Sequence, residues 1–149
     1  MKLAFIFNQD KLSGKMTKLF TGCYCYHTAW VDEEAGHMYD MNLLYRRRKW
    51  PHYPEANVIM FDVPEVTRDY LEAKLTNEES RYGVMDYCLF LIRPILHLFG
   101  KPTINVGGEI CSETCNDDLW ACGIETPWSY NDSPPSPCDL YKFMKERSV

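Results

Sequence analysis

The segment GGEICSETCNDDLWACG, residues 107–123, carries the strongest local signal in the chain. Gly107 and Gly108 interrupt the preceding structure, and the residues after them predict a helix that ends before Gly123. Cys111 then lies in the first helical turn, where unpaired backbone N–H groups and the helix dipole favour an anion. A thiolate is such an anion and is the nucleophilic form of cysteine. Cys111 is therefore a candidate nucleophile.

A nucleophilic cysteine needs a base, and the chain offers a histidine on a predicted strand. His27 lies in the stretch CYCYHTAW, residues 23–30, within a strand expected at residues 23–32. A cysteine at a helix start that faces a histidine on a sheet can lose its proton to the imidazole. The alternative interpretation is a buried structural cysteine and a strand histidine with ordinary hydrogen bonds.

An acid or amide that orients the histidine would complete the site. A turn at residues 33–36 joins the His27 strand to a returning strand expected at residues 38–46. If the turn is centred near Ala35, pairing across it places a residue close to positions 40 to 43 roughly opposite His27. Asp40 is the candidate, and Asn42 is the competitor because strand alternation puts it on the same face.

The order of predicted elements indicates the fold class. The sequence predicts strands at residues 1–8, 23–32, 38–46 and 57–62. It predicts helices at residues 13–20, 64–75, 85–99, 111–122 and 139–147. Strands grouped early and helices grouped late favour an α+β fold in which an antiparallel sheet packs against helices. A length of 149 residues favours a single domain over residues 1–149.

Charge and hydropathy argue against a nucleic-acid partner and against a membrane span. The net charge of −5 does not favour a nucleic-acid surface. The basic cluster at residues 46–49 is either a patch for a phosphate or an acidic partner, or a solvated strand end or loop. We expect no membrane span, because no apolar run reaches the length of about 18 residues that a span needs. We also expect no signal peptide, because residues 1–8 lack an apolar core segment and a cleavage site.

The chain has seven cysteines, an odd and high number. With no secretory signal, this count predicts a reduced, cytosolic protein without disulfides. A small zinc module is an alternative, because Cys23, Cys25 and His27 would share one face of a strand. The paired spacing of structural zinc sites is missing, so we expect neither a metal nor a cofactor.

Several short motifs follow one another in an order typical of one superfamily. They are MKLAFIFN (1–8), CYCYHTAW (23–30), MYDMN (38–42), RYGVMDYCLFLI (81–92), EICSE (109–113) and SPCDL (136–140). With these motifs the chain resembles, nearly end to end, the circularly permuted papain-like (NlpC/P60-like) superfamily. It is most similar to small phage-encoded members and to the YiiX/YaeF-like hydrolases. In that superfamily the histidine precedes the cysteine, as His27 precedes Cys111 here.

The resemblance implies a fold and a chemistry. It implies a permuted papain-like domain and a thiol hydrolase or acyltransferase that acts on an amide, ester or thioester. Cys111 would form the acyl-enzyme, His27 would be the base and then the acid, and Asp40 would orient His27. The substrate would be a peptide, a peptidoglycan cross-bridge, a lipid-linked acyl group or a host protein. The alternative is a non-catalytic phage interaction or host-takeover protein on the same fold. A phage protein of either kind would act in the host cytoplasm or with the virion.

Overall fold

The computed structural model describes residues 1–149 except 11, 43, 54–55, 78–110, 129–133 and 149. The elements in chain order are β1 (Lys2–Phe7), α1 (Leu12–Thr21), β2 (Cys25–Asp32), β3 (His37–Asn42), β4 (Leu44–Lys49), β5 (Asn57–Asp62), α2 (Arg68–Asn77), α4 (Cys111–Ala121) and α5 (Pro137–Arg147). The helix expected at residues 85–99 and the glycine pair before Cys111 lie outside the described residues.

The strands form one sheet in the order β4-β3-β2-β1-β5, and all four neighbouring pairs are antiparallel. β1 lies between β2 and β5, and its residues Leu3, Ala4, Phe5 and Ile6 have no exposed surface. An apolar run of this kind is typical of a strand that is buried on both faces. The predicted α+β class with an antiparallel sheet and helices is confirmed.

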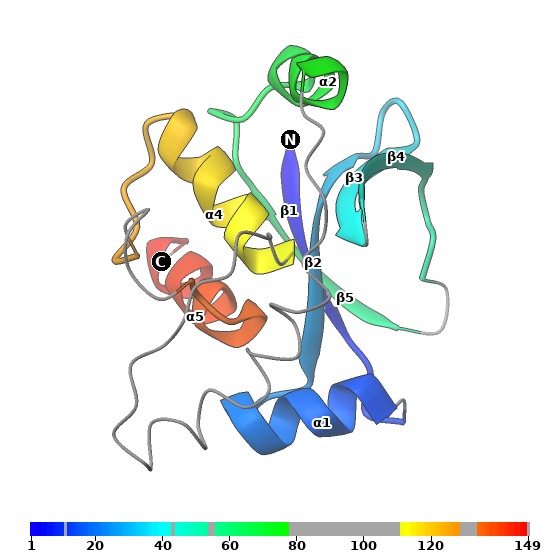
Figure 1. The fold of residues 1–149 in the computed structure, drawn as a ribbon, viewed down its shortest axis with the longest axis vertical. Helices are drawn as coiled ribbons and strands as arrows, with labels where there is room; N and C mark the ends of the chain where they lie inside the picture. The colour runs from blue at the N-terminus through cyan, green and yellow to red at the C-terminus, as the bar shows by residue number, and fades with distance from the viewer. Residues whose placement is uncertain (11, 43, 54–55, 78–110, 129–133, 149) are drawn as a thin grey trace.

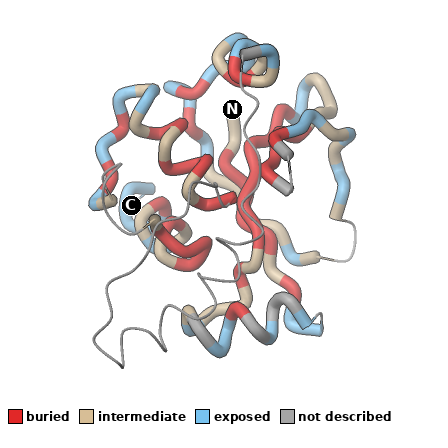
Figure 2. Tube along the Cα trace, in the orientation of Figure 1, coloured by how far each residue is buried: buried red, intermediate tan, exposed pale blue. Residues whose placement is uncertain are grey.

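Helices α4 and α5 lie side by side against one face of the sheet (Figure 1). The larger core cluster lies between these two helices and the sheet, and it includes Leu3, Phe5, Trp30, Leu119 and Leu140. Buried residues therefore follow the central strands and the inner sides of these two helices (Figure 2). The opposite sheet face carries a smaller cluster. Its buried members are Ala4, Ala29, Val31 and Met38, with Trp50, Tyr53, Val58 and Met60 packed against them.

The single strand expected at residues 38–46 is wrong. The chain reverses between Asn42 and Leu44, which are paired across the hairpin that β3 and β4 form. Neither glycine nor proline marks this reversal, and the alternation of side-chain types along the sequence shows no break there. The sequence pattern therefore predicts one continuous strand. As a consequence, the basic cluster is not a loop but lies on β4, at the edge of the sheet.

Two helix starts show how local chemistry sets boundaries. The helix expected from residue 64 begins only at Arg68, because residues 64–66 form a turn in which the Val66 N–H donates to the Val63 carbonyl. Helix α5 begins with a capping box between Ser136 and Asp139, with Pro137 in the first turn. The SPCDL motif is thus a helix start in this protein.

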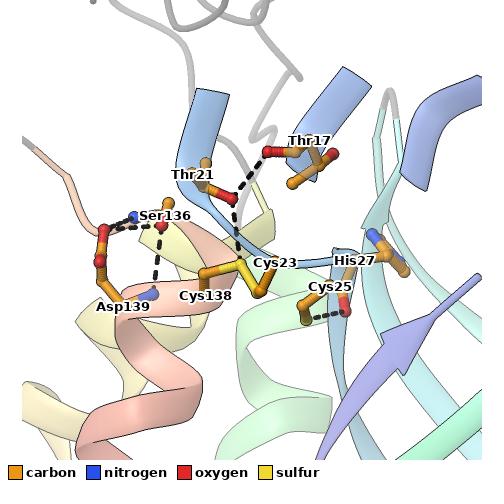
Figure 3. The surroundings of a disulfide bond; sticks show 8 residues. All are labelled: Thr17, Thr21, Cys23, Cys25, His27, Ser136, Cys138 and Asp139. Carbon is orange, nitrogen blue, oxygen red and sulfur yellow. Dashed lines mark hydrogen bonds between the residues drawn. A yellow bond between two sulfur atoms is a disulfide. The ribbon is translucent and has the colours of Figure 1, made fainter. Parts of the chain in front are cut away.

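The expectation that the chain has no disulfide is wrong. Cys23 and Cys138 form a disulfide with a Cα–Cα distance of 6.1 Å, although they are 115 residues apart in the sequence. The bond ties the segment before β2 to α5, and the Thr21 hydroxyl donates to the Cys138 sulfur at 3.0 Å (Figure 3). An odd count does not forbid one pair, and only the docking of α5 brings these two sulfurs together. The cysteine count therefore no longer supports a reducing compartment.

No helix among the described residues is long and apolar enough to cross a membrane.

Candidate active site

A bulge in β2 decides where the side chain of His27 points. Ile6 pairs with His27, but Phe7 pairs with Cys25, so β2 has one extra residue at this point. A bulge of this kind breaks the strict alternation of faces along a strand. Cys25 consequently joins the core cluster beneath the helices, whereas His27 falls on the face of Ala29. The expectation that Cys25 and His27 share a face is wrong.

His27 and Asp40 are brought together by the diverging ends of β2 and β3. The two strands pair from Trp30–Tyr39 to Asp32–His37, and His27 lies beyond this paired stretch. Its Nε2 atom lies 3.1 Å from Asp40 Oδ2. Both side chains are buried, so this contact is shielded from water. The side chain of Asn42, the competing candidate, lies outside the described part of the structure.

Continuing the register of β2 and β3 explains why Asp40 makes this contact. Ala29 is the residue that would lie opposite Asp40, because the paired positions add to a constant sum. Asp40 therefore reaches His27 on the diagonal, a distance that longer side chains can span. The small side chain of Ala29 leaves room for the carboxylate between the two strands.

Two further side chains hold Asp40. Arg48 Nε donates to Asp40 Oδ1 at 2.9 Å, and the Tyr53 hydroxyl donates to Asp40 Oδ2 at 3.2 Å. The Tyr53 ring also meets the His27 ring edge to face, with 5.6 Å between the ring centroids. Burial opposes ionisation of Asp40, but His27 and Arg48 outweigh it and lower the pKa of this carboxyl group.

Neither Arg48 nor Tyr53 is recognisable from the sequence as a partner of Asp40. Arg48 belongs to a run of four basic residues that fits a solvated strand end equally well, and Tyr53 follows a proline in a predicted loop. The register of β3 with β4 is the signal that would have found Arg48, because it places Arg46 opposite Asp40 and Arg48 on the diagonal. That register depends on the hairpin that the sequence did not reveal.

Cys111 is the first residue of α4 and lies beside His27. Asp40 contacts Nε2 of the ring, so Nδ1 is the ring nitrogen that this contact does not use. Burial lowers the pKa of His27, but the charge of Cys111 and hydrogen bonds to Asp40 and Cys111 outweigh it and raise the pKa to about 9. Burial likewise opposes the Cys111 thiolate. The charge and hydrogen bond of His27, helped by Thr28, nevertheless hold the pKa of Cys111 below its usual range.

These opposite shifts favour a thiolate–imidazolium pair. The thiolate also lies at the start of α4, where the first backbone N–H groups of a helix have no partner within it. Helix α4 is held against the sheet by its neighbours. The Ser112 hydroxyl donates to the Pro135 carbonyl at 2.7 Å, and Trp30 Nε1 donates to Asp118 Oδ2 at 2.8 Å. Glu113 lies in the first turn of the helix.

The zinc alternative is not supported by the arrangement of its residues. Cys23 is bound to Cys138, so its thiolate is not available as a ligand. Cys25 is a buried thiol whose pKa is raised, chiefly by burial, and its sulfur contacts the His27 carbonyl at 3.7 Å. In the described part of the chain, no three His, Cys, Asp or Glu side chains are grouped to hold a metal ion.

Comparisons with protein-family models, with curated proteins and with solved structures found no match to this chain. A functional interpretation therefore depends on the chemistry of the site itself.

Proposed function

We propose that the protein is a thiol hydrolase or acyltransferase in which Cys111 is the nucleophile and His27 is the general base. The observation that supports it most directly is the buried His27–Asp40 contact of 3.1 Å, together with the influence of His27 that lowers the pKa of the buried Cys111 thiol. The resemblance of the motifs to the permuted papain-like superfamily points to the same three residues. Perturbed pKa values of this kind gather at functional sites, because a nucleophile and its base must be poised near neutral pH.

The first half of the reaction forms an acyl-enzyme. The Cys111 thiolate attacks the acyl carbon of an amide, ester or thioester, and an S–C bond forms. The bond from this carbon to the leaving group then breaks, and the protonated His27 gives its Nδ1 proton to the leaving group. The oxyanion that forms in between is stabilised by the backbone N–H of Cys111 and the start of α4.

The second half regenerates the thiol site. Water, or an acceptor with a hydroxyl or amine group, attacks the thioester carbon and gives its proton to His27. The S–C bond breaks, the acyl product leaves, and the thiolate–imidazolium pair is restored. By contacting Nε2, Asp40 fixes the orientation of the His27 ring and stabilises its positive charge.

The proposal is tested by labelling with acyl-directed electrophiles. A panel of probes that carry peptide, muramyl-peptide and fatty-acyl groups would be offered to the wild-type protein, to Cys111→Ala and to Cys115→Ala. We expect one covalent adduct per chain on Cys111 with at least one probe class, no adduct in Cys111→Ala, and unchanged labelling in Cys115→Ala. The probe class that reacts fastest identifies the acyl group.

A folded protein whose Cys111 reacts no faster than its other free thiols would overturn the proposal. That outcome favours the second interpretation, a non-catalytic interaction protein that keeps the fold. Mass spectrometry of peptides locates the adduct, and the four free cysteines of the described chain, Cys25, Cys111, Cys115 and Cys122, serve as internal references.

A further inference from the structure

A hollow of about 410 Å³ lies where the turn between β2 and β3 meets the end of β4. This volume is within the range of small-molecule sites. Its lining is dominated by basic and aromatic side chains and contains no carboxylate. The lining residues are Ala35, Gly36, His37, Arg47, Arg48, Lys49 and Trp50.

The backbone around this hollow is tied together. The Trp50 N–H donates to the Gly36 carbonyl at 2.9 Å, which joins the end of β4 to the turn. His37 lies directly opposite Lys49 in the pairing of β3 with β4. Gly36 has a φ of 65°, a conformation that favours glycine, and a Cβ atom added there would meet nothing within 4 Å. The hollow thus has a defined wall and open space at its glycine.

The cationic groups of the hollow retain donors for a ligand. Arg47 Nη1 donates to Glu72 Oε1 at 2.8 Å, and Arg48 Nε donates to Asp40 Oδ1 at 2.9 Å. Each contact uses one of the five N–H donors of a guanidinium group and holds that side chain in place. Lys49 is exposed and has no ion pair with any described residue.

A second hollow shows that this charge is local. It has a volume of about 590 Å³ and is lined by the end of β2, the start of α2 and their neighbours. Five of its lining residues are acidic: Asp32, Glu33, Glu34, Asp62 and Asp69. In a chain with a net charge of −5, a lining with three basic residues and no acidic one is therefore a local feature, and the carboxylates that pair with Arg47 and Arg48 lie outside it.

We propose that the hollow bounded by Gly36, Arg47, Lys49 and Trp50 binds a phosphate group. Guanidinium groups match phosphate oxygens with paired hydrogen bonds, and a lysine adds a point charge. A single phosphate group fits better than a nucleic acid, because the hollow is small and the whole chain is negative. This site does not depend on the chemistry proposed for Cys111, although Arg48 lines the hollow and also contacts Asp40.

The binding test is a titration of the full chain with inorganic phosphate at constant ionic strength, in which NMR shifts are the readout. We expect saturable shifts of the Gly36 amide and the Trp50 indole. Lys49→Gln should weaken binding by about tenfold, since a hydrogen bond to a charged group is lost. The control is Lys142→Gln, which removes an exposed charge from α5 and should leave binding unchanged. Shifts that do not saturate, or that weaken equally in both variants, would overturn the proposal.

Two further arms identify the source of the phosphate group. One arm titrates glycerol 3-phosphate, and the other sediments the protein with phosphatidylcholine vesicles that contain phosphatidic acid. Binding to vesicles that is lost in Lys49→Gln assigns a lipid headgroup, whereas saturable binding of the soluble ester alone assigns a free phosphorylated molecule. Binding of neither overturns the proposal. The Cys111→Ala protein should bind phosphate like the wild type, so this result is independent of the proposed reaction.

Discussion

Helix α4 holds two buried thiols, Cys111 and Cys115, in opposite electrostatic surroundings. They are one turn apart and belong to the same core cluster, so burial opposes the thiolate at both. At Cys111 the neighbouring charge is that of His27, and the pKa of the thiol is lowered. At Cys115 burial is reinforced by the charge of Asp118, and the pKa of the thiol is raised well above its usual range. The identity of the neighbour, not the depth of burial, separates the thiol whose pKa is lowered from the thiol whose pKa is raised.

The two carboxylates of these regions differ in the same way. Asp118 accepts hydrogen bonds from Trp30 Nε1, the Tyr70 hydroxyl and Lys74 Nζ, at 2.8, 2.9 and 2.8 Å. It ties α4 to β2 and α2, and its charge raises the pKa of Cys115. Asp40 instead contacts His27, and the charge of His27 in turn lowers the pKa of Cys111. Asp118 thus links α4 to β2 and α2, whereas Asp40 orients the ionisable ring of His27.

The largest effect should follow from breaking the structural carboxylate's ion pair. Lys74→Met leaves the buried charge of Asp118 without its cation, and we expect a loss of about 3–5 kcal/mol in the free energy of unfolding. Chemical denaturation with the disulfide intact measures it. Lys142→Met on exposed α5 is the control and should change stability by about 0.5 kcal/mol or less. A loss below about 1 kcal/mol in Lys74→Met would show that Asp118 does not depend on this pair.

The next effect concerns the thiol at the start of α4. His27→Ala removes the positive partner of Cys111, so we expect the pKa of the thiol to rise by one unit or more and alkylation near pH 7 to slow by about ten- to a hundredfold. Iodoacetamide labelling read by mass spectrometry measures the rate at each cysteine. Cys115 should stay slow in both proteins, because Asp118 and burial act on it unchanged. An unchanged Cys111 rate in a folded His27→Ala protein contradicts the ion pair.

The same pair predicts a bell-shaped pH profile for acyl transfer. The pKa of Cys111 is lowered, so activity should rise as the thiolate forms below the pH at which a free thiol ionises. The pKa of His27 is raised to about 9, so activity should fall as pH rises through 9 and the ring loses the proton it must donate. Turnover of the best acyl probe measures both limbs. A profile that keeps rising above pH 9 would show that His27 is not the acid.

The smallest effect compares two tyrosines that donate to the two carboxylates. Tyr53→Phe removes a hydroxyl contact to Asp40, and Tyr70→Phe removes the matching contact to Asp118. Each change should lower the free energy of unfolding by about 0.5–1.5 kcal/mol, because one hydrogen bond is lost. Only Tyr53→Phe should slow acyl transfer, by about two- to tenfold, whereas Tyr70→Phe should lower stability and leave the rate unchanged. Equal changes of rate in both variants would remove the distinction between the two regions.

Local patterns predicted much of the sheet and the candidate site. The strand expected at residues 57–62 coincides with β5, and the helix expected from residue 111 begins at Cys111. One turn and the alternation of two strands pointed to Asp40 or Asn42 as the partner of His27, and the contact found is that of Asp40. These features depend on residues that are close in sequence, so periodicity and turn chemistry are enough to indicate them.

Other features depend on contacts that no local pattern encodes. The reversal between β3 and β4 has no glycine or proline, and it alone brings Arg48 to Asp40. The bulge that separates Cys25 from His27 depends on how β2 pairs with β1. The Cys23–Cys138 disulfide depends on the docking of α5 beside the start of β2.

The sequence by itself determined the nature of the reactive groups: a cysteine at a helix start, a strand histidine and an acid after a turn. Only the tertiary structure decided their electrostatic state. The lowered pKa of Cys111 depends on His27, which lies 84 residues earlier in the sequence, and the raised pKa of Cys115 depends chiefly on burial. Electrostatic interaction depends on distance in space and on burial, and the fold determines both.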